Sequence, residues 1–142
     1  DEDIRRIVNG KNIPEGIGEN DFSYIATACV SHPFDFMTKV KKALSCSGNA
    51  FISVLTPCPT GWNFPPAQTL KVGLKAVQTG YYPLYEIENG KLTITERVLK
   101  RKPLPELLAM QKRFFVFEAK LVPSLQIAVD TLYEGLLEKE NK

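Results

Sequence analysis

The chain has 142 residues, the length of one domain, and a hydrophobic content of 44%, which is ordinary for a globular protein. Its 18 basic and 16 acidic residues leave a net charge of +2, so nucleic acid is not an expected partner, and Lys100–Lys102 is predicted to be a solvated connector. No stretch of about 18 apolar residues occurs, so no membrane span is predicted. The acidic start Asp1–Asp3 has no following apolar region, so no signal peptide is predicted.

The sequence contains three cysteines, Cys29, Cys46 and Cys58, and no secretory signal, which makes a disulfide framework unexpected and favours a reducing, cytoplasmic setting. There is no CxxC pair, and His32 is the single histidine. A four-cysteine metal site, a histidine-rich metal site and a two-histidine mechanism therefore cannot be built by this chain alone. GxGxxG and Walker A motifs are absent as well.

The first 30 residues contain a loop and then a strand. Residues 1–21 are polar and are predicted to form a loop, apart from one or two helical turns in Asp3–Val8. The apolar run Phe22–Val30 predicts a buried strand. Pro33 and Asp35 then favour the start of a helix, because proline suits the first turn and a carboxylate interacts well with the helix dipole.

This helix is predicted to pack through one apolar face, with three lysines outside it. The apolar residues are Phe36, Met37, Val40, Ala43 and Leu44, and the lysines are Lys39, Lys41 and Lys42. After the polar segment 45–49, the continuous apolar run Phe51–Leu55 predicts a buried parallel strand. A strand–helix–strand unit of this length predicts a right-handed crossover, which brings the carboxyl ends of both strands to one edge of the sheet.

The second strand ends in the sequence Thr56-Pro57-Cys58-Pro59-Thr60-Gly61-Trp62. Its two prolines prevent both helix and strand around Cys58, so the thiol is predicted to lie on a stiff loop at the sheet edge where α/β proteins bind ligands. From these residues alone, a buried structural thiol is a commoner role for Cys58 than a metal ligand. Trp62 is expected to anchor the loop by packing, although its indole could border a cofactor.

The other candidate site residues have simpler interpretations. Cys29 shares the same sheet edge but lies in an apolar strand, where free cysteine behaves as a small hydrophobic residue. Cys46 lies in a polar loop at the end of a helix and is interpreted as incidental. His32 is interpreted as a residue at the start of a helix.

The second half of the chain is predicted to form a β-hairpin with helices before and after it. Pro65 and Pro66 open a helix that ends at Gly80, with Ala67, Leu70, Leu74 and Val77 on its packing face. Asn89-Gly90 is a strong hairpin signal between Tyr81–Glu88 and Lys91–Glu96. A short helix from Pro103 to about Phe115, a packed segment Phe114–Phe117 and a last helix from Pro123 to about Lys139 complete the chain.

Only two parallel strands are evident, and both look apolar on each face. A two-stranded parallel sheet leaves two edges unpaired and two faces to cover. The chain therefore looks incomplete, and the missing strands are expected to come from another polypeptide or from a removed segment.

In several of these segments the sequence resembles the thiamine-diphosphate-binding β subunit of 2-oxoacid:ferredoxin oxidoreductases, most closely the pyruvate enzyme. The matching segments are Tyr24–Ala28, Phe34–Ala43, Phe51–Trp62 and Ala76–Gly90, and the PCPTGW and TGYYPLYE motifs are the most specific. The resemblance implies that residues 1–142 form a single domain equivalent to the carboxyl-terminal half of such a subunit. The implied fold is α/β, part of a thiamine-diphosphate-binding fold with parallel strands, crossover helices, a β-hairpin and carboxyl-terminal helices.

The resemblance also implies a site and partners. Cys58 matches the last cysteine ligand of a [4Fe–4S] cluster, whereas the other ligands and the segment that binds thiamine diphosphate and Mg²⁺ belong to the amino-terminal half of the family's subunit. This favours a ligand role for Cys58, because a thiolate suits iron–sulfur ligation. At the position of Cys29 the family usually has a different small residue. Partners would be the missing amino-terminal half, the other subunits and ferredoxin, with coenzyme A and a 2-oxoacid as substrates.

Three functions follow as hypotheses. The first is a component of a multisubunit oxidoreductase of anaerobic metabolism, inactive alone, that decarboxylates a 2-oxoacid oxidatively. The second is a non-catalytic assembly or scaffold protein that retains part of the fold. The third, an autonomous small-molecule-binding α/β domain, is disfavoured by the missing strands.

Overall fold

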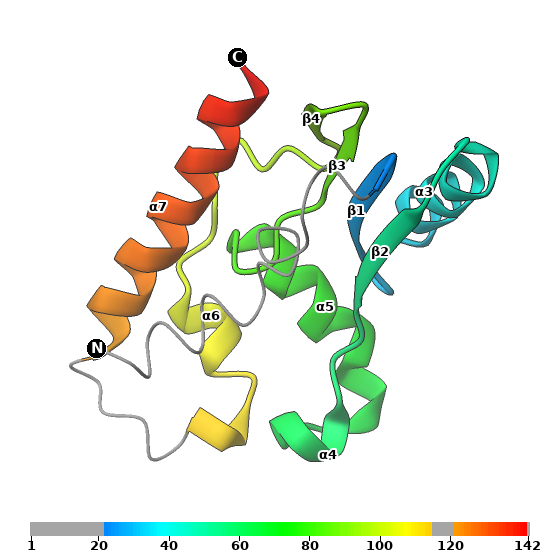
Figure 1. The fold of residues 1–142 in the computed structure, drawn as a ribbon. Coiled ribbons are helices and arrows are strands. Elements are labelled where there is room, and N and C mark those ends of the chain that lie inside the picture. The colour runs from blue at the N-terminus through cyan, green and yellow to red at the C-terminus, as the bar shows by residue number, and fades with distance from the viewer. Residues whose placement is uncertain (1–21, 115–120, 142) are drawn as a thin grey trace.

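The structure is a computed structural model that describes residues 22–114 and 121–141, with helices on both sides of one four-stranded sheet (Figure 1). Its elements are β1 (Tyr24–Cys29), α3 (Pro33–Ser45), β2 (Ala50–Leu55), α4 (Pro59–Trp62), the 3-10 turn η2 (Pro66–Gln68), α5 (Thr69–Gln78), β3 (Tyr85–Glu88), β4 (Lys91–Ile94), α6 (Pro105–Leu108), the 3-10 turn η3 (Lys112–Phe114) and α7 (Val122–Glu140). The predicted α/β class is confirmed. The expected helical turn in Asp3–Val8 and the apolar residues 115–117 lie outside the described part.

The sheet is organised around β1, in the strand order β2-β1-β3-β4. All six residues of β1 are buried, as expected for a continuous apolar strand that is covered on both faces. β1 is parallel to β2, and the register runs from Tyr24 opposite Ala50 to Cys29 opposite Leu55. Both strands therefore end at the same edge of the sheet, as the crossover predicts.

The edges of the sheet differ from the sequence prediction. The expectation that both edges of the parallel pair stay unpaired is wrong, because β3 pairs antiparallel with residues 24–26 of β1. β2 was expected to be buried, but Ala50 and Val54 are exposed, because β1 is its only neighbour in the described sheet. The hairpin itself is confirmed: Asn89 and Gly90 have φ angles of 51° and 78°, the positive values that a tight two-residue turn requires.

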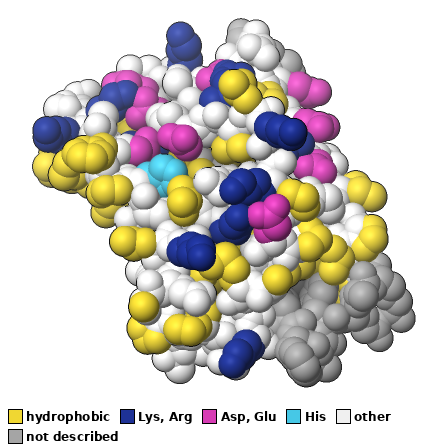
Figure 2. Space-filling view, turned by 180° about the vertical axis from the view of Figure 1, so that it is seen from behind, with side chains coloured by type: hydrophobic (Ala, Val, Ile, Leu, Met, Phe, Trp, Pro, Cys, Tyr) yellow, Lys and Arg dark blue, Asp and Glu magenta, His cyan; other side chains and the backbone are white. Residues whose placement is uncertain are grey.

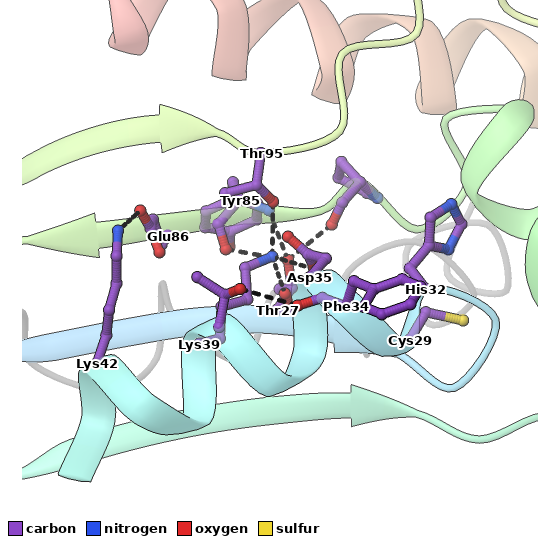
Figure 3. Close-up of polar contacts among 12 residues, drawn as sticks. Thr27, Cys29, His32, Phe34, Asp35, Lys39, Lys42, Tyr85, Glu86 and Thr95 are labelled. Atoms are coloured by element: carbon purple, nitrogen blue, oxygen red, sulfur yellow. Dashed lines mark hydrogen bonds and ion pairs between the residues drawn. The ribbon is translucent and has the colours of Figure 1, made fainter.

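α3 packs on the sheet through a lysine, which the sequence prediction placed outside the packing face. The Lys39 side chain is 1% exposed, and its Nζ donates to Thr27 O, Asp35 Oδ2 and Thr95 Oγ1, each at 2.7 Å (Figure 3). These contacts use all three ammonium donors, which offsets much of the cost of burying the charge. Burial lowers the pKa of Lys39 from its ordinary value, and Asp35 opposes that shift.

A second polar group lies beside Lys39 on the same side of the sheet. Glu86 is buried, accepts a hydrogen bond from the Tyr24 hydroxyl at 2.7 Å and forms an ion pair with Lys42. Burial and the contact with Glu86 raise the pKa of Tyr24 above its ordinary value. Because the hairpin presents these polar groups to α3, the helix turns Lys39 and Lys42 toward them and leaves Met37 and Leu44, both predicted to pack, exposed.

α5 is also rotated from its predicted packing face. Leu70 and Leu74, expected to be buried, are exposed. The buried residues are Val72, Gly73, Ala76 and Val77. A Cβ atom at Gly73 would lie 3.1 Å from both Cys29 Sγ and Ser31 Oγ, so the missing side chain is what lets α5 approach the end of β1 this closely.

The carboxyl-terminal helices complete the main core. α7 lies within about one residue of its predicted bounds, whereas α6 ends well before Phe115. Arg101, predicted to lie in a solvated connector, forms an ion pair with Asp130 at 2.9 Å and lies 4.8 Å from the centre of the Tyr133 ring. The connector is therefore attached to α7 through Arg101. None of the described helices is long and apolar enough to cross a membrane.

The Lys39 contacts predict a stability effect. The free energy of unfolding should fall by about 3 kcal/mol in Lys39→Ala, because the substitution leaves buried oxygen acceptors without their cation. Lys41→Ala, on an exposed position of the same helix, is the matched control and should change it by less than about 0.5 kcal/mol. Urea denaturation followed by circular dichroism measures both, and equal effects would contradict the role assigned to Lys39.

Candidate functional site

The loop after β2 holds Cys58 at the sheet edge that the sequence predicts. Pro57 is fully buried and fixes the start of the loop, while Cys58 is exposed. The expectation that the two prolines prevent a helix here is wrong, because Pro59 is accepted in the first turn of α4. Cys58 caps this short helix, and its Sγ accepts a hydrogen bond from the Gly61 amide at 3.3 Å. A backbone amide directed at the sulfur helps to fix the orientation of the thiol on the turn. The exposed position is inconsistent with a buried structural role for Cys58.

The opposite end of α4 is held by packing and by stacking. Trp62 packs against the main core, which confirms its predicted role as an anchor. The Arg113 guanidinium carbon lies 4.1 Å from the centre of the Trp62 ring, within the range of a cation–π contact. Burial lowers the pKa of Arg113, although an arginine stays protonated at neutral pH. Arg113 is not recognisable as a site residue from the sequence, because no local motif links it to the distant Trp62.

Cys29 reaches the same edge of the sheet, but it lies inside the protein. It is fully buried, and its Sγ lies 3.0 Å from Ser31 Oγ. Ser31 Oγ lies 2.9 Å from His32 Nδ1 in turn, so the end of β1 carries a short polar chain (Figure 3 labels Cys29 and His32). The Cys29 sulfur is enclosed where α5 approaches the end of β1 at Gly73, and among the described residues it belongs to no group of side chains that could hold a metal ion. The interpretation of Cys29 as a small hydrophobic residue agrees with this burial.

His32 and Cys46 mark the two ends of α3. His32 is the N-cap residue, as predicted for a residue at the start of the helix. Cys46 follows the last turn, where its Sγ donates to Ala43 O at 3.2 Å and to Gly48 O at 3.3 Å. Because α3 runs from the carboxyl end of β1 to the amino end of β2, Cys46 lies at the edge of the sheet opposite Cys58.

A shallow groove of about 570 Å³ lies beside the Cys58 loop, between α5 and α6. Its lining includes Asn63 from the loop, together with Lys71, Lys75, Lys112 and Glu106. Lys75 and Glu106 form an ion pair at 2.6 Å, which raises the pKa of the lysine and lowers that of the glutamate. The groove therefore gives the side of the loop a net positive character.

The donor set decides what this chain could bind. Among the described residues no three cysteine, histidine or acidic side chains come together as a metal site. Cys58 alone offers an exposed sulfur on a fixed turn, so it can supply one ligand to a metal centre whose other ligands come from elsewhere. An iron–sulfur cluster fits this sulfur, because hydrogen bonds from backbone amides to the ligand sulfurs are part of how proteins hold and tune such clusters.

The chain is similar in sequence to subunits of pyruvate synthase and ketoisovalerate oxidoreductase. The chain is 60% identical over 91 residues to the pyruvate synthase subunit PorB of Methanocaldococcus jannaschii, a match that covers 64% of this chain and 30% of the relative. It is 43% identical over 126 residues to PorB of Methanothermobacter thermautotrophicus, covering 89% of this chain and 44% of the relative. The ketoisovalerate oxidoreductase subunit VorB of Pyrococcus furiosus is 43% identical over 105 residues, covering 72% of this chain and 34% of the relative.

The chain is homologous to the β subunit of 2-oxoacid:ferredoxin oxidoreductases. The resemblance recognised from the sequence motifs is thereby confirmed. No protein-family model matches the chain. The chain spans less than half the length of the curated relatives named here, from 30% to 44%. The match therefore covers only part of a PorB subunit.

The three free thiols predict an order of chemical reactivity. In the metal-free protein, iodoacetamide should modify Cys58 first, Cys46 more slowly and Cys29 only after unfolding, because their exposure decreases in that order. Mass spectrometry of the alkylated peptides over time measures each rate separately. Modification of Cys29 in the folded protein as fast as that of Cys58 would show that the end of β1 is not packed as described.

Proposed function

We propose that this chain is part of the β subunit of a 2-oxoacid:ferredoxin oxidoreductase, most closely one that acts on pyruvate, and that Cys58 is one ligand of its [4Fe–4S] cluster. The observation that carries the proposal is an exposed thiol on a proline-framed turn, in a chain 60% identical to a PorB subunit over 91 residues. In such an enzyme a 2-oxoacid is oxidatively decarboxylated, its acyl group is transferred to coenzyme A, and the released electrons reduce ferredoxin.

Within that assembly the residues of this chain have a positioning role. Thiamine diphosphate with Mg²⁺ and the cluster supply, when bound, the carbanion and electron-transfer chemistry that side chains lack. The buried Pro57 fixes the direction of the turn, and the Gly61 amide donates to Cys58 Sγ at 3.3 Å and orients the sulfur. A reducing cytoplasm would keep this thiol available for iron. Activity would require the rest of the subunit, because Cys58 supplies only one of the cluster's ligands.

The amino-terminal half that the resemblance implies for such a subunit is the proposed partner of the β2 edge. The opposite edge of the sheet is covered: α7 packs on β4, and the Glu140 carboxylate accepts a hydrogen bond from the Ile94 amide at 2.9 Å. β2 has β1 as its only described neighbour. A long apolar edge strand without charges is a template for another strand. More than half of each named relative lies outside the matched region, which is enough chain to supply that strand.

The outer side of α3 extends the same surface. Phe34 and Leu44 are 79% and 83% exposed, and Met37 lies between them on the same side of the helix. Figure 2 shows hydrophobic side chains gathered at the left of the molecule, where α3 lies when Figure 1 is turned round. Because α3 packs on both β1 and β2, a polypeptide that pairs with β2 would also reach these residues.

Cys58→Ser in the anaerobically purified complex tests the ligand. Serine is nearly isosteric with cysteine, so the subunits should still assemble, but its hydroxyl is a harder and far less acidic ligand than the thiol. Retention of the cluster should fall by roughly tenfold to a hundredfold, and ferredoxin reduction should fall far more than thiamine diphosphate binding. Iron analysis, electron paramagnetic resonance and a ferredoxin assay measure the three quantities.

Cys46→Ser is the matched control for this experiment and should leave the iron content unchanged. Loss of iron in Cys29→Ser, with none in Cys58→Ser, would mean that the wrong thiol on this edge of the sheet was chosen. Full iron content in all three variants would refute the cluster assignment and favour the scaffold hypothesis.

Val54→Pro tests the β2 edge. The Val30 amide donates to Leu55 O at 3.3 Å, so the backbone groups of Leu55 face β1 and, by the alternation of a parallel ladder, those of Val54 face away. Proline at such a position removes no bond to β1, but it blocks an added strand. Assembly of the complex from its separate parts should fall at least about tenfold, whereas Val54→Thr, which keeps the amide, should assemble normally.

Titration of one part into the other, followed by size-exclusion chromatography, measures this assembly. Normal assembly of Val54→Pro would contradict strand addition at β2. If the proline instead removed self-association of this chain and left the complex intact, a second copy of the chain would be the partner of this edge.

A further inference from the structure

Arg113 is a charged residue at the Cys58 loop that the proposed function leaves unused. Its guanidinium lies over Trp62, the last residue of α4, at 4.1 Å from the ring centre. Cys58 is one helical turn away, because the Trp62 amide donates to Cys58 O at 2.8 Å. A cation therefore rests on the turn whose other end carries the exposed sulfur.

Arg113 is itself held in place by the segment before it. Its Nε donates to Gln111 Oε1 at 2.8 Å. Gln111 is 2% exposed, and its amide nitrogen donates to Leu107 O at 3.1 Å, which links it to α6. A planar guanidinium with one edge bound to an amide can still stack its face on an aromatic ring, which an ammonium group cannot do. The arrangement thus suits arginine specifically.

The same segment also holds the backbone just after α4. The Lys112 amide donates to Asn63 O at 3.0 Å, and Asn63 has a φ angle of 54° in the left-handed region. α4 is a single turn of four residues, too short to keep its shape without outside contacts. Its conformation therefore depends on what packs against it, and Lys112 and Arg113 supply contacts from outside the helix.

We propose that Arg113 is a positioning residue for the iron–sulfur centre, which fixes the turn carrying Cys58 by stacking on Trp62. This inference rests on the proposed function, because it requires Cys58 to be a cluster ligand. A ligand sulfur on a rigid turn keeps its direction when the metal is absent, so the cluster forms and persists more readily. The guanidinium also adds a positive charge to the turn that carries Cys58, and a positive charge in the surroundings of a cluster would favour its reduced, more negative state.

Two substitutions separate the stacking from the charge in the assembled, anaerobically purified complex. Arg113→Gln removes both, whereas Arg113→Lys keeps the charge and loses the planar stacking. Arg97→Gln is the matched control, because Arg97 pairs with Glu140 on α7 instead of contacting the Cys58 loop. Hydrogen exchange of the peptide spanning residues 58–63, measured on iron-depleted complex, reports the rigidity of the turn without any cluster.

Three results are expected. Amide exchange in residues 58–63 rises roughly fivefold in Arg113→Gln, with a smaller rise in Arg113→Lys, in proportion to the lost cation–π contact. Release of iron to a chelator accelerates in the same order. The reduction potential of the cluster falls in Arg113→Gln and is restored by Arg113→Lys, a pattern that a purely structural defect would not produce. Exchange in α7 stays unchanged, which shows that the variants are folded.

Unchanged exchange, iron release and potential in Arg113→Gln would overturn the inference. Cys58→Ser, measured in the same complex, separates the positioning role of Arg113 from the ligand role of Cys58. If Cys58→Ser loses iron while Arg113→Gln behaves as the parent protein does, the positioning role fails and the proposed function stands. If Cys58→Ser retains its iron, the proposed function fails, and the positioning role fails with it.

Discussion

The parallel pairing of β1 with β2 is the constraint on which the rest of the structure depends. Parallel strands cannot be joined by a tight turn, so the chain must return through a crossover helix, and that helix is α3. The same geometry brings the ends of both strands to one edge, so the polar chain after Cys29 and the loop of Cys58 share that edge. An antiparallel pair would have placed them at opposite edges.

The polar contacts under α3 are a consequence of how the sheet is extended. β3 pairs antiparallel with β1 and β4 pairs antiparallel with β3, and this hairpin brings Glu86 and Thr95 beneath the helix. Lysines have the length to reach these groups, and Lys39 satisfies all its donors there. The hairpin is thereby connected to the crossover unit by buried hydrogen bonds as well as by the strand ladder. Such contacts are directional, so they fix the rotation of α3 about its axis.

The sequence predicts what local chemistry controls. Asn89-Gly90 defines its hairpin because few residues accept positive φ at both positions, and the prolines around Cys58 confine the loop wherever it lies. Which side of α3 and of α5 packs against the rest of the protein is not predictable from local sequence. Both helices carry apolar residues on two sides, and the choice between them depends on partners distant in sequence, the polar hairpin for Lys39 and the end of β1 for Gly73. The stacking of Arg113 on Trp62 is likewise a tertiary contact with no local signal.

The Glu140 contact with the Ile94 amide limits how copies of this chain could assemble. Open-ended growth of a sheet into a fibril needs two exposed edges per molecule, because each molecule must pair with one neighbour at each edge. The described sheet has its β4 side occupied by α7, so only the β2 side can accept a strand. Edge-to-edge association of this chain would therefore stop at a symmetric pair. A subunit whose partner is absent would then accumulate as closed dimers and not as filaments.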